Sequence, residues 1–115
     1  GKSSLETIDK NTTVGDAIVM MNKKGIDQVP VCDGKEFVGS LIDSRVLKAL
    51  IDNPDIRSQP VSEIMDPSFQ FVAMYNTLDV LSSLINRENK ALLVRDEKNE
   101  VHIITQSDLL MAMTN

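Results

Sequence analysis

Thr105 and Asp108 are the side chains whose types and spacing are best suited to chemistry in this chain. The pattern Thr-x-x-Asp brings a hydroxyl and a carboxylate together where a strand ends and a helix begins. A carboxylate can accept hydrogen bonds from a ribose diol, and each such charge-assisted bond contributes about 1.5–3 kcal/mol. Backbone N–H groups at the helix start add donors for an anionic group. The same residue types also cap helices without any ligand, and the motif alone favours capping.

A second polar pair, Asp27 and Gln28, lies between the expected end of a helix and a buried strand. Backbone groups in this segment can read the edge of an adenine ring. The neighbouring Ile26 side chain can cover the face of such a ring. The alternative is a plain helix-to-strand turn with solvated polar side chains, and the segment by itself favours that turn.

The sequence offers no candidate residues for metal binding or for catalysis. His102 is the single histidine and is expected at the edge of a strand, so we predict no metal site. No Ser/His/Asp set and no glycine-rich phosphate loop is present, so we predict no catalytic residue. Cys32 is the single cysteine and falls in an apolar run, where a buried, reduced thiol is expected. These features predict a regulatory or binding domain that is not an enzyme.

Charge and hydropathy narrow the class of partner. The formal net charge is −5, which argues against nucleic acid, because phosphates require a clustered basic surface. No run of about 18 apolar residues is present, so we predict no membrane span. A lone, reduced cysteine fits a cytoplasmic location. The chain begins Gly1-Lys2 without Met, and we expect it to be a fragment of a longer protein.

The chain contains an internal duplication. The segment that begins at Val29 recurs at Leu92, a shift of 63 residues (from 29 to 92). At this shift Thr105 and Asp108 align with Ile42 and Arg45 of the first copy. Only the second copy therefore has a hydroxyl and a carboxylate at this junction, which predicts one working site in a pseudo-symmetric module.

Each copy is predicted to fold as strand-helix-strand-strand-helix, an α/β (α+β) architecture. Capping residues, helical spacing of apolar residues and Gly or Asp-Gly turn signals mark the elements. We predict a first repeat at 5–53, a linker at 54–60 and a second repeat at 61–115. In the first repeat the expected strands are 5–8, 29–32 and 37–42. One helix is expected to follow the capping residues 11–13 and to end at Gly25, and a second to follow the capping pair Asp43-Ser44. In the second repeat the expected strands are 69–74, 91–94 and 101–105, with one helix after the capping pair Asn76-Thr77 and another over 106–113.

A repeat of roughly 50 residues buries too little surface to be stable alone. We therefore expect the two repeats to pack together, and clefts at such interfaces are where small-molecule sites form.

The doubled pattern resembles the tandem CBS-domain pair, also called a Bateman module. The motifs that carry the resemblance are Val-Pro-Val-x-Asp at 29–33, Val-Gly at 38–39 and Ile-Ile-Thr-x-x-Asp-Leu-Leu at 103–110, and it extends over about residues 5–113. The segment Gly-Ile-Asp-Gln-Val-Pro-Val at 25–31 is similar to the C-terminal regulatory region of the cystathionine β-synthase family, pyridoxal-phosphate enzymes of sulfur amino-acid metabolism.

The resemblance implies an allosteric module that binds S-adenosylmethionine, or AMP, ADP or ATP, in a cleft between the repeats. It also implies a homodimer and a catalytic domain elsewhere in the parent chain. The ligand contacts carried over from the family are Ile26, Asp27, Gln28 and Val29 in the first copy and Ile103, Thr105, Ser107, Asp108 and Leu110 in the second. The family usually has glycine where this chain has His102, which is expected to narrow the cleft.

Charge favours one ligand class. Asp27 and Asp108 are carboxylates, and the motifs contain no Lys or Arg, so the sulfonium and ammonium groups of S-adenosylmethionine suit the site better than a triphosphate. The pseudo-symmetric site at Ile42 and Arg45 is expected to be empty or altered. The alternative function is a ligand-independent dimerisation module, which would not need Thr105 and Asp108.

Overall fold

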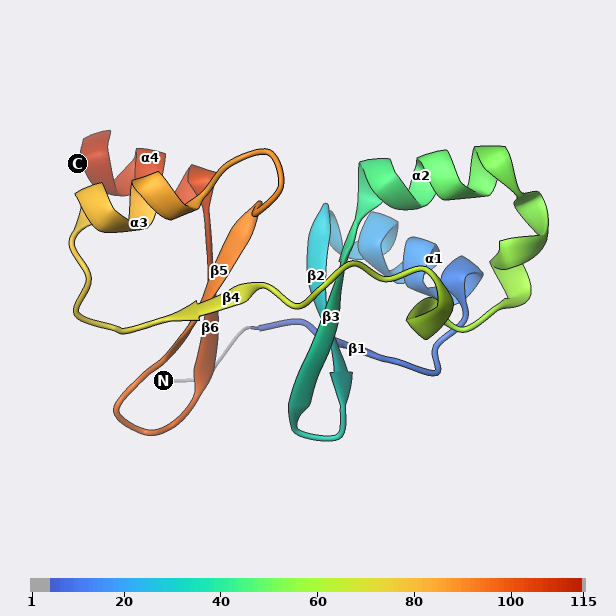
Figure 1. The fold of residues 1–115 in the computed structure, drawn as a ribbon, viewed down its shortest axis with the longest axis horizontal. Coiled ribbons are helices and arrows are strands. Elements are labelled where there is room, and N and C mark those ends of the chain that lie inside the picture. The colour runs from blue at the N-terminus through green and yellow to red at the C-terminus, as the bar shows by residue number, and fades with distance from the viewer. Residues whose placement is uncertain (1–4, 115) are drawn as a thin grey trace. The chain divides into compact units, whose positions relative to one another are not determined.

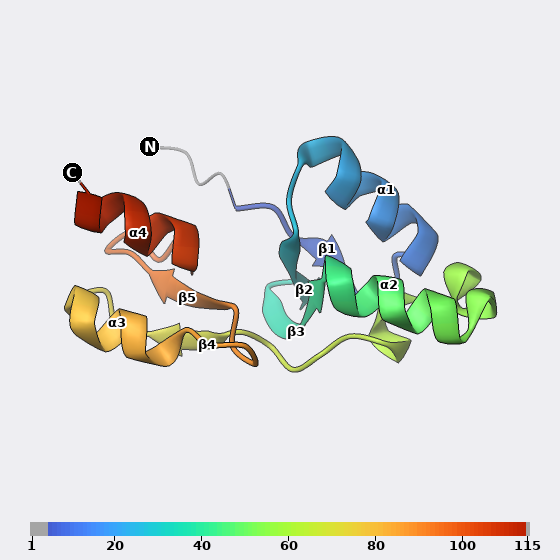
Figure 2. The same ribbon diagram turned by 90° about the horizontal axis from the view of Figure 1, so that it is seen from above.

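In the computed structural model, which describes residues 5–114, the chain forms two compact units, Glu6–Ser68 and the part from Phe69 onward. Each unit has the order strand-helix-strand-strand-helix (Figure 1), so the predicted α/β repeat is confirmed. In each unit, the two helices lie on one side of that unit's own sheet (Figures 1 and 2).

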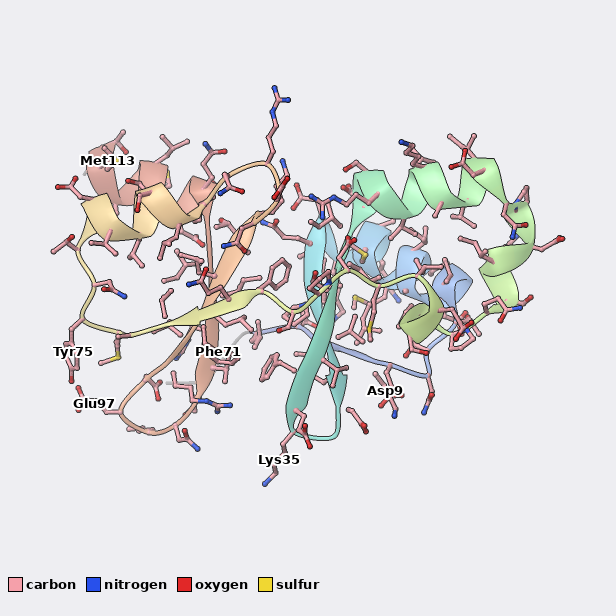
Figure 3. All side chains as sticks on the ribbon, viewed as in Figure 1. Asp9, Lys35, Phe71, Tyr75, Glu97 and Met113 are labelled. Atoms are coloured by element: carbon pink, nitrogen blue, oxygen red, sulfur yellow. The ribbon has the colours of Figure 1, made fainter. Side chains whose placement is uncertain are left out.

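The first unit is built on a sheet in the order β1-β2-β3, with β1 parallel to β2 and β2 antiparallel to β3. Its elements are β1 (Ile8–Asp9), α1 (Val14–Lys24), β2 (Gln28–Asp33), β3 (Glu36–Ile42), α2 (Asp43–Asp52) and two 3-10 helices, η1 (Pro54–Ser58) and η2 (Val61–Glu63). The turn between β2 and β3 contains Gly34 at φ 62°, a left-handed conformation that glycine adopts readily. Figure 3 shows Lys35 at the tip of this turn, directed away from the sheet.

Helix α1 begins and ends at residues that the sequence identified as boundaries. Thr13 caps the helix, since its Oγ1 accepts a hydrogen bond of 3.2 Å from the Asp16 N–H. Gly25 ends the helix at φ 65°, as a left-handed C-cap. The buried residues of α1 follow helical spacing and face the core: Val14, Ala17 and Met21.

The core of the first unit is aliphatic and centres on β2, whose residues 29–32 are all buried. Val61 also belongs to this core, with 0% exposure, and its N–H donates to the carbonyl of Thr12 at 2.8 Å. The segment from 61 to 68, which the repeat pattern assigned to the second copy, thus packs with the first unit. The Ser62 N–H also donates to the Lys10 carbonyl at 3.1 Å, and Asp66 pairs with Ser40 of β3. The repeat pattern does not show these contacts, because they join residues that are distant in the sequence.

The second unit repeats the sheet in the order β4-β5-β6, with β4 parallel to β5 and β5 antiparallel to β6. Its elements are β4 (Gln70–Val72), α3 (Leu78–Leu84), β5 (Ala91–Arg95), β6 (Val101–Thr105) and α4 (Gln106–Thr114). The strand expected at 69–74 is therefore shorter. Helix α3 has 7 residues where α1 has 11. In place of a glycine C-cap, Asn89 Nδ2 donates to the Leu84 carbonyl at 2.9 Å.

The second unit has a buried core of its own, centred on β5, whose residues 91–94 are all buried. Its core cluster contains Leu81, Leu92 and Leu109, and several large apolar side chains are exposed on its helices. Met113 on α4 is 66% exposed and points outward from the helix (Figure 3). Within residues 5–114, the helices are too short or too polar to cross a membrane.

Candidate functional site

The junction of β6 and α4 holds Thr105 and Asp108 in a fixed geometry. Asp108 Oδ2 accepts hydrogen bonds from the Thr105 N–H at 2.8 Å and from Thr105 Oγ1–H at 3.0 Å. The Asp108 N–H lies 3.4 Å from Thr105 Oγ1 in return. The capping function that the motif favoured is therefore present. In the described part of the chain, the other carboxylate oxygen, Oδ1, makes no hydrogen bond, so the cap leaves an acceptor on an exposed, positioned carboxylate.

The remaining second-copy residues of the predicted site surround this junction. Ser107 is exposed in the first turn of α4, beside Asp108. Ile103 is partly buried on β6, where it pairs with Leu93. Leu110 is 57% exposed on α4. The Thr105 and Ser107 hydroxyls and the Asp108 carboxylate thus belong to the β6–α4 junction, and Leu110 follows further along α4.

The first-copy residues of the predicted site form the loop between α1 and β2. The Ile26 N–H donates to the Met21 carbonyl at 3.0 Å, which closes the helix end and leaves Ile26 partly buried. Asp27 is exposed, and its backbone carbonyl accepts a hydrogen bond of 3.0 Å from the Asp43 N–H. Gln28 is partly buried. The loop is therefore anchored at one end by α1 and at the other by the first residue of α2.

Val29 differs from its neighbours because its side chain is 0% exposed. It packs in the core of the first unit. The family resemblance placed Val29 among the ligand contacts, whereas the predicted buried strand at 29–32 agrees with its burial.

A groove of about 760 Å³ lies along this loop in the first unit. Ile26 and Asp27 line it, as do residues that sequence reasoning did not single out for a site. These come from the second half of α1 and the first turns of α2: Ile18, Val19, Met21, Asn22, Lys23, Gly25, Asp43, Ser44 and Leu47. Its walls are largely aliphatic, and its charged residues are two carboxylates, Asp27 and Asp43, and the ammonium group of Lys23. The sequence offers one signal for this groove: Val19 and Leu47 are apolar residues at exposed helix positions.

The pseudo-equivalent junction of β3 and α2 has a different chemistry. Ile42 is 5% exposed and caps nothing with its side chain. Arg45 Nη1 lies 3.2 Å from Asp66 Oδ2 in the segment after η2. The first junction therefore has neither the hydroxyl nor the carboxylate of the second, and its arginine is engaged within its own unit.

His102 lies on β6, as expected for a strand residue, and contacts a carboxylate. Its Nε2 is 2.8 Å from Asp96 Oδ2. This hydrogen bond is the main cause that lowers the pKa of Asp96, with the Glu100 and Lys98 N–H groups acting in the same direction. Burial raises the pKa of the Cys32 thiol. No cluster of His, Cys, Asp or Glu suited to a metal occurs among residues 5–114.

Comparisons with known proteins agree on the kind of domain. A sequence model of the CBS domain matches residues 2–52 and 61–115. Cystathionine beta-synthase of Oryctolagus cuniculus is 27% identical over 92 residues, which is 79% of this chain and 17% of that enzyme. This chain therefore spans about a sixth of the length of that relative.

Solved structures share the fold. A CBS-domain protein of Burkholderia ambifaria superposes with a TM-score of 0.83 at 25% identity, over 96% of this chain and 82% of that one. CBSX2 in complex with AMP superposes with a TM-score of 0.77 at 23% identity, over 96% and 88% of the two chains. The family match covers both repeats, and the chain belongs to the CBS-domain family, of which it carries two domains in tandem.

Proposed function

We propose that this CBS pair is a regulatory module that binds one adenosyl ligand with residues from both repeats. The second repeat contributes Thr105, Ser107 and Asp108, and the first contributes the segment 26–29. The observation that carries the proposal is the Asp108 carboxylate, which Thr105 holds in place while Oδ1 remains free to accept from a ribose hydroxyl. A ribose is the common part of S-adenosylmethionine, AMP, ADP and ATP. The AMP complex of CBSX2, a protein of the same fold, supports this ligand class.

Charge favours S-adenosylmethionine among these ligands. Asp27 and Asp108 are exposed carboxylates, and none of the nine proposed contact residues is basic. A triphosphate would be repelled there, whereas a sulfonium and an ammonium group are attracted. We further propose that the module occupies a C-terminal regulatory position in a pyridoxal-phosphate enzyme of the cytoplasm. The similarity to cystathionine beta-synthase of Oryctolagus cuniculus supports this kind of parent enzyme.

Titration calorimetry with S-adenosylmethionine, AMP and ATP tests this proposal. We expect heat of binding with at least one ligand, and at least tenfold weaker binding by Asp108→Asn, about 1.4 kcal/mol. The matched control is Asp79→Asn, which removes an exposed carboxylate from the first turn of α3 in the same unit. Folded protein that binds none of the three ligands would refute the function. Unchanged affinity in Asp108→Asn would refute the site.

Homodimerisation is a second candidate function, and exposed apolar side chains favour it. In the first unit, Val19, Leu47 and Ile51 are 64%, 57% and 71% exposed on the outer faces of α1 and α2. Large exposed apolar patches mark interaction surfaces. Sedimentation equilibrium of the ligand-free chain distinguishes the candidates. A stable dimer with no response to any adenosyl ligand would support dimerisation as the function, and a monomer would oppose it.

A further inference from the structure

The segment after η2 is attached to the edge of β3. We call Met65–Pro67 the linker strap. The Ser40 N–H donates to the Asp66 carbonyl at 2.9 Å, and the Asp66 N–H donates to the Ser40 carbonyl at 2.9 Å. The Ser40 hydroxyl donates to the Pro67 carbonyl at 2.7 Å. Ser40 is 2% exposed and is the buried polar residue of the described chain. Three hydrogen bonds thus fix the strap to the sheet.

Close packing adds to this attachment. A Cβ atom at Gly39 would lie 2.8 Å from Met65 Cγ and 3.0 Å from the Asp66 carbonyl oxygen. The strap can follow β3 this closely only because position 39 has no side chain. The pseudo-equivalent position in the second repeat is His102, so such a strap would not fit there in the same way.

Arg45 connects the strap to helix α2. Its Nη1 is 3.2 Å from Asp66 Oδ2, and the two side chains are 38% and 35% exposed. Arg45 lies in the first turn of α2, two residues after Asp43. The Asp43 N–H in turn donates to the carbonyl of Asp27 at 3.0 Å. A continuous series of contacts therefore runs from the loop that holds Asp27, through the first turn of α2, to the strap.

We propose that the Arg45–Asp66 ion pair is a latch that couples the Asp27–Gln28 loop to the linker strap, so that a ligand held by this loop stabilises the strap. The ligand response rests on the proposed function, whereas the latch itself does not. By linkage, a loosened strap must weaken ligand binding by the same factor by which the ligand stabilises the strap. Because the ion pair is partly exposed, we expect a coupling of about two- to fivefold.

The ligand-free protein tests the latch. Amide exchange followed by NMR reports the protection factors of the Ser40 and Asp66 N–H groups. In Arg45→Met and in Asp66→Asn, we expect both protection factors to fall by about two- to fivefold. In the double variant, we expect protection factors no lower than those of the more affected single variant, since both changes break the Arg45–Asp66 ion pair. Lys48→Met removes an exposed positive charge from the same helix and should leave both amides unchanged. Unchanged protection in the single variants, or additive losses in the double variant, would overturn the latch.

A second arm tests the ligand response with S-adenosylmethionine and AMP as probes. In wild-type protein, the bound ligand should raise protection of the Asp66 N–H. In Arg45→Met, the ligand should still bind, about two- to fivefold more weakly, without raising that protection. Equal ligand-induced protection in both proteins would overturn the coupling while the proposed function stands. Failure of wild-type protein to bind either probe would refute the proposed function and the ligand response together.

Discussion

The two strand-helix junctions of this molecule occupy equivalent positions in the duplicated sequence and are stabilised differently. At β6–α4, Thr105 and Asp108 cap the helix and leave a carboxylate oxygen free. At β3–α2, Ile42 is a core residue, and Arg45 pairs with Asp66 of the linker strap. The comparison shows how a duplicated fold can divide its tasks. The second copy keeps polar groups accessible at its junction. The first copy uses the equivalent position to attach the linker strap.

Replacement of Ile42 should have the largest effect on stability. Ile42→Ala removes a side chain that is 5% exposed and leaves a cavity, so we expect a loss of about 2–5 kcal/mol in the free energy of unfolding. Urea denaturation measures it. Ile51→Ala, at a position that is 71% exposed on α2, the helix that follows Ile42, is the control and should stay within about 0.5 kcal/mol of wild type. A small effect at Ile42 would mean that the first junction is not part of the core.

Gly39→Ala tests the strap side of the comparison. The added methyl group must displace Met65 or Asp66, and such overpacking costs about 1–3 kcal/mol. His102→Ala, at the pseudo-equivalent position, loses only a partly exposed contact to Asp96 and should cost less than about 1 kcal/mol. Denaturation curves of the two variants give the difference directly. Equal losses in the free energy of unfolding would show that the strap does not require glycine at position 39.

Thr105→Ala should have a moderate effect, because it removes a helix cap from a partly exposed junction. We expect a loss of about 1 kcal/mol, measured by thermal or urea unfolding. Thr114→Ala, which removes a hydroxyl near the other end of the same helix, should cost less. Unchanged stability in Thr105→Ala would show that the hydrogen bonds between Thr105 and Asp108 do not stabilise α4.

The smallest expected effect concerns pH. His102 and two backbone N–H groups lower the pKa of Asp96 in the folded state below its ordinary value of 3.8. Stability from this group is therefore fully present above pH 3.8 and is lost as the pH falls through the lower folded pKa. We expect wild type to exceed Asp96→Asn in stability at neutral pH and the difference to shrink in acid. His102→Ala should reduce the same acid dependence. A difference that stays constant down to pH 2 would contradict the assignment.

Much of the local structure could be predicted from residue types. Thr13 and Gly25 bound α1 as expected, because capping depends on neighbours in the sequence. The buried strands at 29–32 and 91–94 followed from their apolar runs. The Thr105–Asp108 pair could also be identified, since its members are three residues apart.

Contacts between distant segments could not be predicted in this way. The repeat pattern assigned Asp66 to the second repeat, and nothing in its neighbourhood indicates that it would pair with Ser40 and Arg45. These features are tertiary, because a strand's neighbours and a linker's path are set by packing.

The central claim is that the asymmetry of the two junctions produces one ligand site. Calorimetry of the wild-type chain with S-adenosylmethionine, beside Asp108→Asn and Arg45→Met, tests it most directly. The account predicts one ligand per chain, at least tenfold weaker binding in Asp108→Asn, and retained binding at the same stoichiometry in Arg45→Met. Two ligands per chain, or a loss in Arg45→Met that equals the loss in Asp108→Asn, would contradict it.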